Sequence, residues 1–381
     1  MEIPASAPKL HTLHFNVTNT CNLSCSFCYI DAVKAKTTSI PLRRIQELAI
    51  EARAVGGVRV IVSGGEAFIR KDWPETFFAF ADQDFAVSIV SNGTLLSPNV
   101  IAQLKTIPKL SILVSLDGDA ESHNTIRGAK NAHRRTIAGL KRLREAGVNV
   151  QVNATIIKTN LQDVPYLTQL SRDLDVSLRF SLLNPYNGRG TDMVSTALDV
   201  HQVLALREFC HEVRLLGSRV FINLPPLLQY PEDIVPIRSP SCGWTKSYCG
   251  VTYDGNVTIC GVAGADESLY VGNIMEQSFA DIWLTAPLFN ELRSLSHDDL
   301  TGICSRCTYR ADCGGACRLS AYKGSGDFTA SYSMCQAFYD AGVVDETFLD
   351  PGSSVKSTSK RCYLPIEAVN GGGKRVITAL G

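Results

Sequence analysis

Three cysteines follow one another within eight residues near the start of the sequence. Cys21, Cys25 and Cys28 have the spacing CxxxCxxC. Three thiolates at this spacing can each bind one iron of a cubane iron–sulfur cluster, which leaves the fourth iron without a protein ligand. An open metal position is typical of a catalytic rather than a structural site. The motif alone also allows a zinc site that lacks one ligand, or a chance cluster of cysteines.

Eight further cysteines gather in the C-terminal part of the chain, and they are enough for two four-ligand metal sites. They are Cys242, Cys249, Cys260, Cys304, Cys307, Cys313, Cys317 and Cys335. A pair of zinc sites is the alternative, although the five-residue spacer between Cys307 and Cys313 is shorter than the dozen or so residues usual between pairs of zinc ligands. Cys210 and Cys362 stand apart from these groups, and we interpret both as ordinary thiols.

Four polar and glycine-rich segments follow the second, third and fourth predicted strands, the last two of them after the fourth strand. They are residues 63–66 (SGGE), 91–93 (SNG), 115–118 (SLDG) and 127–128 (RG). Glycines let the backbone approach a ligand, and the Glu66 carboxylate can accept a hydrogen bond from an ammonium group. Each segment alone could be a plain turn, but together they indicate a binding rim.

The elements that must position these groups alternate between β-branched runs and amphipathic runs. Strands are predicted over residues 11–18, 58–63, 86–91, 111–116, 148–156 and 177–182, and helices over residues 41–55, 73–81, 98–106, 134–146 and 164–172. This alternation favours an α/β fold with parallel strands, either an open sheet or a partial barrel. Such folds place their chemistry at the carboxyl ends of the strands, where the motifs lie.

Four segments are predicted along the chain. A partial barrel covers residues 1–190 and ends in the turn-rich run 184–190, and a bridging helical segment covers residues 191–236, with a helix at about 199–216. A cysteine-rich domain covers residues 237–340. It has little room for a large apolar core, so metal sites are expected to hold it together. Residues 341–381 are expected to form a loosely attached tail.

Composition limits the partners and the compartment. The chain has 381 residues with 37 basic and 37 acidic side chains, which does not call for nucleic acid or an anionic membrane as partner. No apolar run is long enough to span a membrane, and the N-terminal segment lacks the pattern of a secretory signal. We therefore expect a cytoplasmic protein, where closely spaced cysteines more often hold metal than form disulfides.

On these motifs the chain resembles the radical S-adenosylmethionine (SAM) superfamily, whose fold is a partial (β/α)6 TIM barrel. The C-terminal cysteine pattern resembles the SPASM extension of those enzymes, and the two resemblances cover about residues 10–340. They imply three [4Fe–4S] clusters. The first would be held by Cys21, Cys25 and Cys28, and its open iron would bind SAM.

The resemblance also implies ligands for two auxiliary clusters. One would take Cys242, Cys249, Cys260 and Cys317, and the other Cys304, Cys307, Cys313 and Cys335. With four thiolates each, neither cluster would have an iron free for substrate, so electron transfer is their expected role.

Six residues are implied in SAM binding. Phe27 would lie beside the nucleoside, and Gly64, Gly65 and Glu66 would bind the SAM amine. Ser115 and Arg135 would bind the SAM carboxylate. No residue is predicted to act as a base towards the substrate.

The implied reaction is the reductive cleavage of SAM to a 5′-deoxyadenosyl radical, which takes hydrogen from a substrate. The electron would come from an external donor such as a flavodoxin or ferredoxin. A peptide or protein is the leading substrate class, and a small-molecule intermediate (a tetrapyrrole, sugar or nucleoside) is the alternative.

Two sequence features bear on the peptide hypothesis. Only 20 residues precede Cys21, so a separate peptide-recognition protein is expected to present such a substrate. Gly261 stands where relatives that mature sulfatases carry a catalytic aspartate, directly after the cysteine that Cys260 matches, and this argues against that chemistry.

Overall fold

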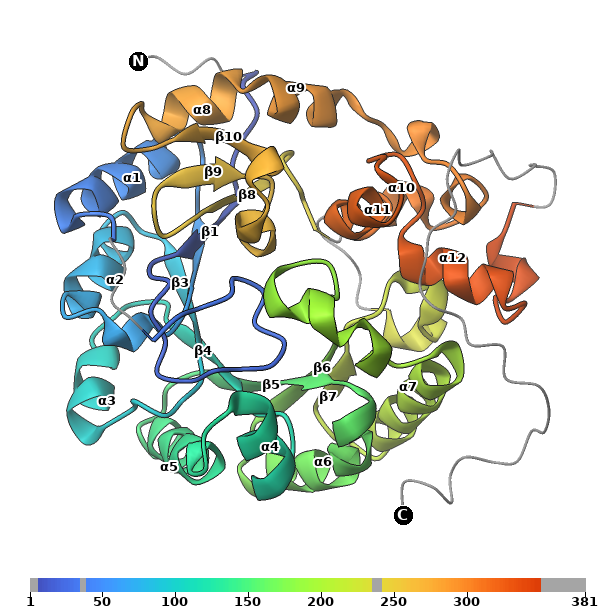
Figure 1. Cartoon of the computed structure of the whole chain (residues 1–381), viewed down its shortest axis with the longest axis horizontal. Helices are drawn as coiled ribbons and strands as arrows, with labels where there is room; N and C mark the ends of the chain where they lie inside the picture. Colours follow the sequence, from blue (N-terminus) through green and yellow to red (C-terminus); the bar gives the residue numbers. More distant parts are fainter. Residues whose placement is uncertain (1–5, 35–38, 235–241, 351–381) are drawn as a thin grey trace.

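One sheet runs through the molecule. The computed structural model describes residues 6–34, 39–234 and 242–350. Within these ranges ten strands pair in the order β10-β9-β8-β1-β2-β3-β4-β5-β6-β7. Neighbours from β8 to β7 are parallel, whereas β8, β9 and β10 pair antiparallel. Helices surround this curved sheet, as Figure 1 shows.

The predicted partial barrel is present. Its strands are β1 (Thr12–Asn16), β2 (Arg59–Ser63), β3 (Ala86–Ser91), β4 (Ser111–Ser115), β5 (Val150–Ile156) and β6 (Ser177–Leu182). The predicted helices correspond to α1 (Leu42–Ala54), α2 (Trp73–Ala81), α3 (Pro98–Leu104), α5 (Ala132–Glu145), α6 (Val164–Asp173) and α7 (Val200–Leu215). All of these predictions are confirmed to within a few residues at each end.

One barrel helix was not predicted. α4 (Ala120–Arg127) begins after Asp119, whose carboxylate accepts hydrogen bonds from the backbone N–H groups of residues 121 and 122. It ends at Gly128, which has φ +66° and lies in the left-handed region that glycine adopts without steric cost. An aspartate cap and a C-terminal glycine are sequence signals for such a helix.

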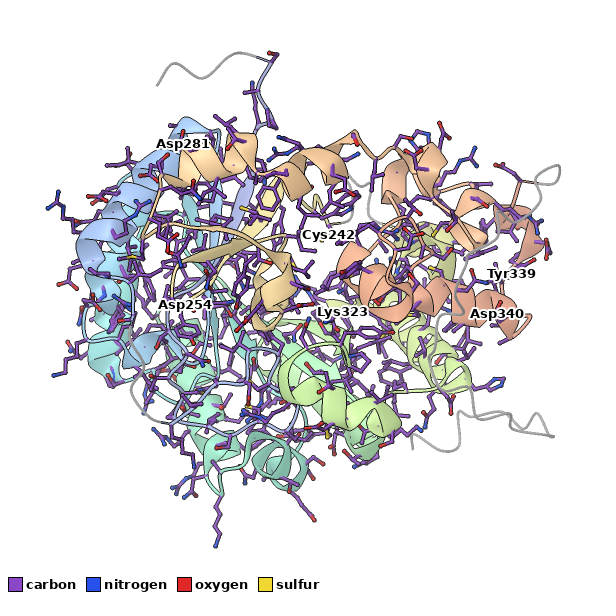
Figure 2. All side chains as sticks on the ribbon, turned by 45° about the horizontal axis from the view of Figure 1, so that its top comes forward. Cys242, Asp254, Asp281, Lys323, Tyr339 and Asp340 are labelled. Atoms are coloured by element: carbon purple, nitrogen blue, oxygen red, sulfur yellow. The ribbon has the colours of Figure 1, made fainter. Side chains whose placement is uncertain are left out.

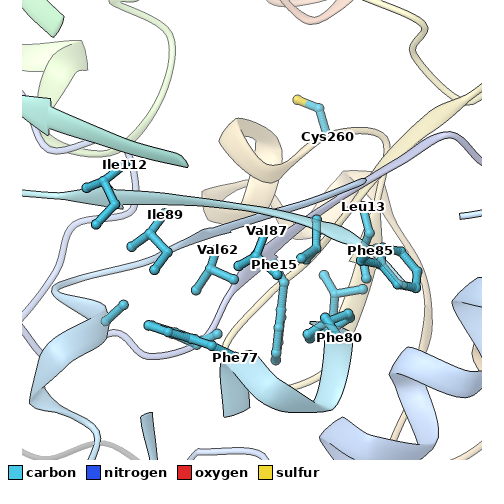
Figure 3. Packing of buried hydrophobic residues seen from close by; sticks show 14 of the residues in the cluster. Leu13, Phe15, Val62, Phe77, Phe80, Phe85, Val87, Ile89, Ile112 and Cys260 are labelled. Carbon is cyan, nitrogen blue, oxygen red and sulfur yellow. The ribbon is translucent and has the colours of Figure 1, made fainter. Parts of the chain in front are cut away.

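Alternation along the strands decides which side chains face the barrel interior. In β3, β4 and β5 every second residue is buried on the outer face, under the helices. Figure 3 shows this core, where Val87 and Ile89 of β3 and Ile112 of β4 lie near Phe77 and Phe80 of α2. The polar residues between them are therefore on the inner face.

Two short strands extend the parallel sheet beyond the six repeats. β7 (Val220–Ile222) pairs with β6, and β8 (Tyr248–Val251) pairs with β1. The predicted boundary at residue 190 therefore does not coincide with an edge of the sheet. Strands of three or four residues are too short for their apolar period to stand out in a sequence.

The prediction that the cysteine-rich region has little apolar core is wrong. β9 (Asn256–Thr258) and β10 (Tyr270–Asn273) are followed by α8 (Phe279–Thr285) and α9 (Pro287–Ser294). Phe279, Trp283 and Phe289 of these helices are fully buried in the same core as the barrel strands. The region is therefore stabilised by apolar burial as well as by its metal ligands.

A second, smaller core forms between α7, the segment after β7 and α12 (Ser333–Asp340). The last helices of the described chain are α10 (Arg310–Cys313), α11 (Arg318–Ser325) and α12. Phe338 of α12 and Leu349 of the predicted tail belong to the smaller core, whereas Leu319 of α11 packs into the main core. The rest of that tail, from residue 351 and including Cys362, lies outside the described residues. In the ranges that the structure describes, no helix is long and apolar enough to cross a membrane.

Candidate active site and auxiliary metal sites

A cavity of about 330 Å³ lies at the carboxyl ends of the barrel strands. Ser63, Ser91 and Ser115, at the ends of β2, β3 and β4, are part of its wall. Cys21, Cys25 and Cys28, from the loop after β1, line the same cavity. The chain therefore places its first cysteine motif where parallel α/β folds place their chemistry.

The three cysteine sulfurs are oriented by N–H donors. The backbone N–H of Leu23 donates to Cys21 Sγ at 3.4 Å, and that of Ala32 donates to Cys28 Sγ at 3.3 Å. Arg127 donates to Cys25 Sγ at 3.5 Å. Hydrogen bonds to sulfur stabilise thiolates and tune iron–sulfur clusters, so these residues fit a cluster. Without metal, burial raises the pKa of the Cys21 thiol to about 12, so iron binding must displace its proton.

The arrangement suits a cluster better than one ion. Among the described residues, no three Cys, His, Asp or Glu side chains converge closely enough to hold a single metal ion. A cubane does not require such convergence, because each thiolate binds a different iron.

Gly64 and Gly65 line the cavity with their backbone, and both positions exclude a side chain. A Cβ at Gly65 would lie 2.1 Å from the carbonyl oxygen of Thr20, directly before Cys21. Gly64 has φ +129°, and a Cβ there would lie 2.4 Å from Thr18 O. The loop after β2 can therefore lie directly against the cysteine loop, as the predicted SAM-binding role requires.

The Glu66 carboxylate is fully buried and turns away from the cavity. It accepts hydrogen bonds from Ser91 Oγ at 2.9 Å and from the Asn92 backbone N–H at 2.8 Å. Burial raises its pKa to about 7, although these hydrogen bonds act in the opposite direction. Glu66 therefore orients two residues that do line the cavity, and its contact with the SAM amine stays a prediction.

Arg135 does not reach the cavity; Arg127 does. Arg135 is exposed on α5, whereas the Arg127 guanidinium is buried in the cavity wall, 5.5 Å from the ring centre of Phe27. The correction has a simple cause. Arg127 is the last residue of α4, the helix that was not predicted. In the chain, α4 comes between β4 and α5, the helix that carries the predicted Arg135.

A buried carboxylate fixes Arg127. Asp117 Oδ2 accepts from Arg127 Nε at 2.6 Å, and Asp117 Oδ1 accepts from the Thr155 backbone N–H at 3.0 Å. Burial alone would lower the pKa of the guanidinium, but Asp117 and Cys25 outweigh it and raise that pKa. The result is a permanent cation beside Cys25 and Phe27.

The far wall of the cavity contains residues that were not singled out from the sequence. Asn153 and Thr155 of β5 and Ser181 of β6 line it, together with Asn184 and Arg189 from the loop that follows. Ser181 Oγ donates to Asn153 Oδ1 at 2.8 Å. The three strand residues occupy the polar positions of the alternating pattern in the two predicted strands, and this pattern could have identified them from the sequence.

The four cysteines predicted for the second auxiliary cluster lie together. Cys304, Cys307, Cys313 and Cys335 line one small pocket, together with Tyr309 and Tyr332. Burial raises the pKa of Cys307 to about 12, and its neighbours Cys304 and Cys313 add to the shift. A closed, four-thiolate site of this kind fits a cluster with no iron left open.

The first auxiliary set is only partly assembled. Burial raises the pKa of Cys242 to about 12, and the neighbouring Cys317 thiol raises it further. Burial also raises the pKa of Cys260, and the Cys242 and Cys317 thiols raise it further, so the three cysteines lie close together. Figure 2 shows Cys242 between the β8–β10 strands and the C-terminal helices. Cys249 lies elsewhere, on the outer face of β8, in register with Leu13.

Of the two cysteines interpreted as ordinary thiols, only Cys210 lies within the described residues, and it is outside these sites. Cys210 is buried on α7 in the main core, and Cys362 falls beyond the described residues. Gly261 packs against the ring of His14, because a Cβ there would lie 2.2 Å from His14 Cγ. An aspartate could not occupy this position without moving His14.

Two family models match the chain. Residues 15–170 match the radical SAM superfamily, and residues 242–308 match the SPASM iron–sulfur cluster-binding domain. The AdoMet-dependent heme synthase of Methanosarcina barkeri is 30% identical over 353 residues, which cover 87% of this chain and 97% of that relative. The PqqA peptide cyclase of Granulibacter bethesdensis is 26% identical over 328 residues, covering 84% of this chain and 85% of that relative.

A solved structure has the same fold. Streptococcus suis SuiB bound to S-adenosylmethionine superposes with a TM-score of 0.71 at 18% identity, covering 86% of this chain and 78% of that one. SuiB has also been solved with its precursor peptide SuiA, with a TM-score of 0.70 to this chain. With its SAM barrel and its cluster-binding domain both matched, this chain belongs to the radical SAM superfamily as a SPASM enzyme that uses SAM and [4Fe–4S] clusters.

Proposed function

We propose that this enzyme oxidises a small molecule that carries carboxylate side chains, of the tetrapyrrole class, by abstracting a hydrogen atom from it. The observation that carries the proposal is the likeness to a heme synthase over 97% of that relative's length. The shared length includes both the barrel and the auxiliary region. This proposal reverses the order of the two substrate classes expected from the sequence.

The SAM side of the cavity has a defined composition. Cys21, Cys25 and Cys28 would hold the first cluster, and Gly64 and Gly65 would lie against SAM. When bound, this pair supplies a 5′-deoxyadenosyl radical that takes a hydrogen atom from the substrate. The protein encloses the site and keeps water from it, and Arg127 supplies a fixed positive charge.

The far wall is suited to a polar substrate. The side chains of Asn153, Thr155 and Ser181 offer amide and hydroxyl groups, which can donate hydrogen bonds to carboxylate oxygens. Arg189 adds a guanidinium at the same wall, where it also pairs with Asp31 at 2.6 Å. Leu182, Leu183 and Val262 supply apolar surface for a macrocycle.

Peptide modification is the second candidate. The likeness to a PqqA peptide cyclase supports it, at an identity only a few percent lower than that to the heme synthase. The fold shared with SuiB is compatible with both candidates, because a likeness at 18% identity concerns the fold alone.

The proposal is tested by following deuterium from the substrate into 5′-deoxyadenosine, the product of SAM cleavage. Anaerobically reconstituted enzyme is reduced in the presence of SAM and an iron porphyrin with deuterated propionate side chains. We expect deuterium in the 5′-deoxyadenosine and a porphyrin of changed mass, because the hydrogen is abstracted from that side chain. The variant with Cys21, Cys25 and Cys28 replaced by Ala serves as the control and should give neither product.

Unlabelled 5′-deoxyadenosine together with unchanged porphyrin would contradict the proposal. The peptide candidate would then be tested with a short peptide encoded beside the gene. Peptide-dependent formation of 5′-deoxyadenosine and a mass change in the peptide would support it.

A further inference from the structure

The cysteines expected at the first auxiliary cluster do not share one face of the sheet. In the β1–β8 ladder, Cys249 is in register with Leu13, and Gly250 is in register with His14. Neighbouring residues on a strand point to opposite faces, and residues in register on parallel strands point to the same face. Cys249 is therefore on the outer face with Leu13, whereas Gly250 and His14 are on the inner face.

Cys260 lies on the inner face. A Cβ on Gly250 would lie 2.4 Å from the carbonyl carbon of Cys260, so Cys260 packs directly against that face. Figure 3 shows the same separation, with Leu13 and Phe15 on one side of the strands and Cys260 on the other, its sulfur pointing away from them. The sheet itself therefore lies between Cys249 and Cys260.

The surroundings of Cys249 are those of a core thiol. Its side chain is fully buried, and burial raises its pKa. The charged neighbour that lowers this pKa is Arg293 of α9, whose guanidinium lies 4.2 Å from the ring centre of Trp283.

An imidazole occupies the inner face beside Cys260. His14 is 8% exposed, and its ring lies against Gly261, the residue after Cys260. Its Nδ1 is hydrogen bonded to the hydroxyl of Tyr248 at 2.7 Å. Its Nε2 is buried and has no hydrogen-bond partner within the described residues.

A buried nitrogen without a partner costs free energy unless a ligand satisfies it. Tyr248 lies on the same inner face as His14, because it is in register with Thr12, two residues before His14.

We propose that Cys249 is a core thiol and that the first auxiliary cluster is held by Cys242, Cys260 and Cys317, with His14 as its fourth ligand. In this arrangement the Nδ1–H of His14 would donate its hydrogen bond to the Tyr248 hydroxyl, which fixes the ring and leaves the lone pair of Nε2 for iron, as metal-binding histidines commonly do. Replacing a thiolate by a neutral imidazole removes one negative charge, so this cluster has a higher reduction potential than one with four thiolates.

The test uses the full chain with Cys21, Cys25 and Cys28 replaced by Ala, so that only the auxiliary clusters contribute iron and spectra. In this background Cys249→Val keeps the bulk of the buried side chain and cannot bind iron. We expect it to retain about eight irons per chain and an unchanged EPR spectrum of the reduced protein. Cys249→Ala is the second variant if valine disturbs folding, and Cys210→Val is the matched buried control.

The second measurement identifies the nitrogen. Pulsed EPR of the reduced protein should show one strongly coupled ¹⁴N nucleus. The coupling should be absent in His14→Ala. Addition of ¹⁵N-imidazole to this variant should give a ¹⁵N coupling in its place. Cys362→Ala should leave the spectrum unchanged.

Three results would overturn the proposal. Loss of about four irons in both Cys249 variants, with Cys210→Val intact, would return Cys249 to the cluster. Absence of nitrogen coupling in the parent protein would exclude His14 as a ligand. Loss of the cluster in Cys362→Ala would assign the fourth position to that thiol instead.

Discussion

Arg127 connects a buried carboxylate, a cysteine sulfur and an aromatic ring. Its guanidinium donates to Asp117 and Cys25 and lies over the ring of Phe27. Asp117 is fully buried, so the pair cannot be separated without leaving a charge in an apolar place. From the sequence, Arg127 and Arg135 are both plausible SAM ligands. In the structure only Arg127 lines the cavity, whereas Arg135 is exposed on α5.

Replacement of each arginine by methionine tests this difference. Arg127→Met should lower the free energy of unfolding by about 3–5 kcal/mol, because Asp117 loses its counter-ion. It should also weaken SAM binding. Arg135→Met is the matched control and should change the unfolding free energy by no more than about 0.5 kcal/mol, because Arg135 is exposed. Denaturant titrations and SAM titrations check both; equal effects of the two variants would contradict this assignment.

Glu66 gives the stability of the protein a pH dependence. Its folded-state pKa of about 7 lies above the ordinary value of 4.5, so between these values the folded chain keeps a proton that the unfolded chain releases. Stability is therefore lost as the pH rises through this window, and the loss is complete above pH 7.

Glu66→Gln removes this titration. The variant should gain about 2.5 kcal/mol relative to wild type between pH 5 and pH 8, as measured by denaturant unfolding of metal-free protein. Gln103→Glu, on α3, serves as a control for the added or removed charge. A constant difference between Glu66→Gln and wild type over this range would show that Glu66 titrates normally.

At the scale of elements, the loop after β2 and the loop after β1 are held together by backbone contacts. The Gly65 N–H donates to Thr18 O at 2.7 Å, and the Glu66 N–H donates to Thr20 O at 2.9 Å. These bonds fix the start of the cysteine loop. Only a residue without a Cβ allows them at position 65.

Gly65→Ala should therefore disturb the first cluster and leave the auxiliary clusters in place. We expect a loss of about four of about twelve irons. The unfolding free energy should fall by about 1–3 kcal/mol, because the added methyl group overpacks the loops. Gly264→Ala is a milder control, since a Cβ there meets the methyl group of Thr252 at 3.0 Å. Full iron content in Gly65→Ala would show that the cysteine loop does not depend on this contact.

Helix α4 shows where local helix signals were not sufficient for prediction. α4 carries Arg127, and its cap at Asp119 and its end at Gly128 are both visible in the sequence. Its eight residues contain few apolar side chains, so the helical period was too weak to predict it.

At the scale of the whole molecule, the barrel and the cluster-binding region share one core. β8 pairs with β1. Helix α8 packs beside α1, where the Phe279 backbone N–H donates to Glu51 at 2.6 Å. The Trp283 indole donates to Pro8 O at 2.7 Å. The two regions should therefore unfold together.

A truncated chain that ends at residue 234 tests whether the barrel depends on the cluster-binding region for folding. It would leave the edge of β1 unpaired and expose apolar surface that Phe279, Trp283 and Phe289 cover, each of which contributes about 2–3 kcal/mol. We expect a poorly soluble product without a cooperative melting transition by circular dichroism. A soluble, cooperatively melting fragment would show instead that the barrel folds independently.

Arg318 relates the two auxiliary sites to each other. It is 1% exposed and donates to the carbonyl oxygens of Phe328 and Ala330 at 2.9 and 2.6 Å. Burial raises the pKa of Cys242 and Cys317 in one set and of Cys335 in the other, and the charge of Arg318 acts in the opposite direction on all three. A buried cation in this position stabilises negative charge at both sites.

Arg318→Gln should therefore lower the reduction potentials of both auxiliary clusters and leave that of the SAM-binding cluster unchanged. EPR-monitored redox titration measures all three potentials in one sample. Arg318→Lys keeps the charge and should give smaller shifts. A shift at only one auxiliary cluster would show that Arg318 does not act on both.

The sequence by itself determined the local features of this protein. The CxxxCxxC motif fits within eight residues, so its spacing alone brings three sulfurs near one another. The barrel strands of five to seven residues and the barrel helices other than α4 carry enough apolar period to be located. The family follows from these local signals, and the second auxiliary set follows mostly from closely spaced cysteines.

Only the tertiary structure decided which face each residue takes. Cys249 and Cys260 are both close to Gly255 in sequence, yet they lie on opposite sides of the sheet. β8 has four residues and pairs with a strand far away along the chain, so its pairing and its facing could not be deduced from its own residues. The same holds for Arg127 and Arg135, because the position of α4 against the barrel decides which guanidinium reaches the cavity.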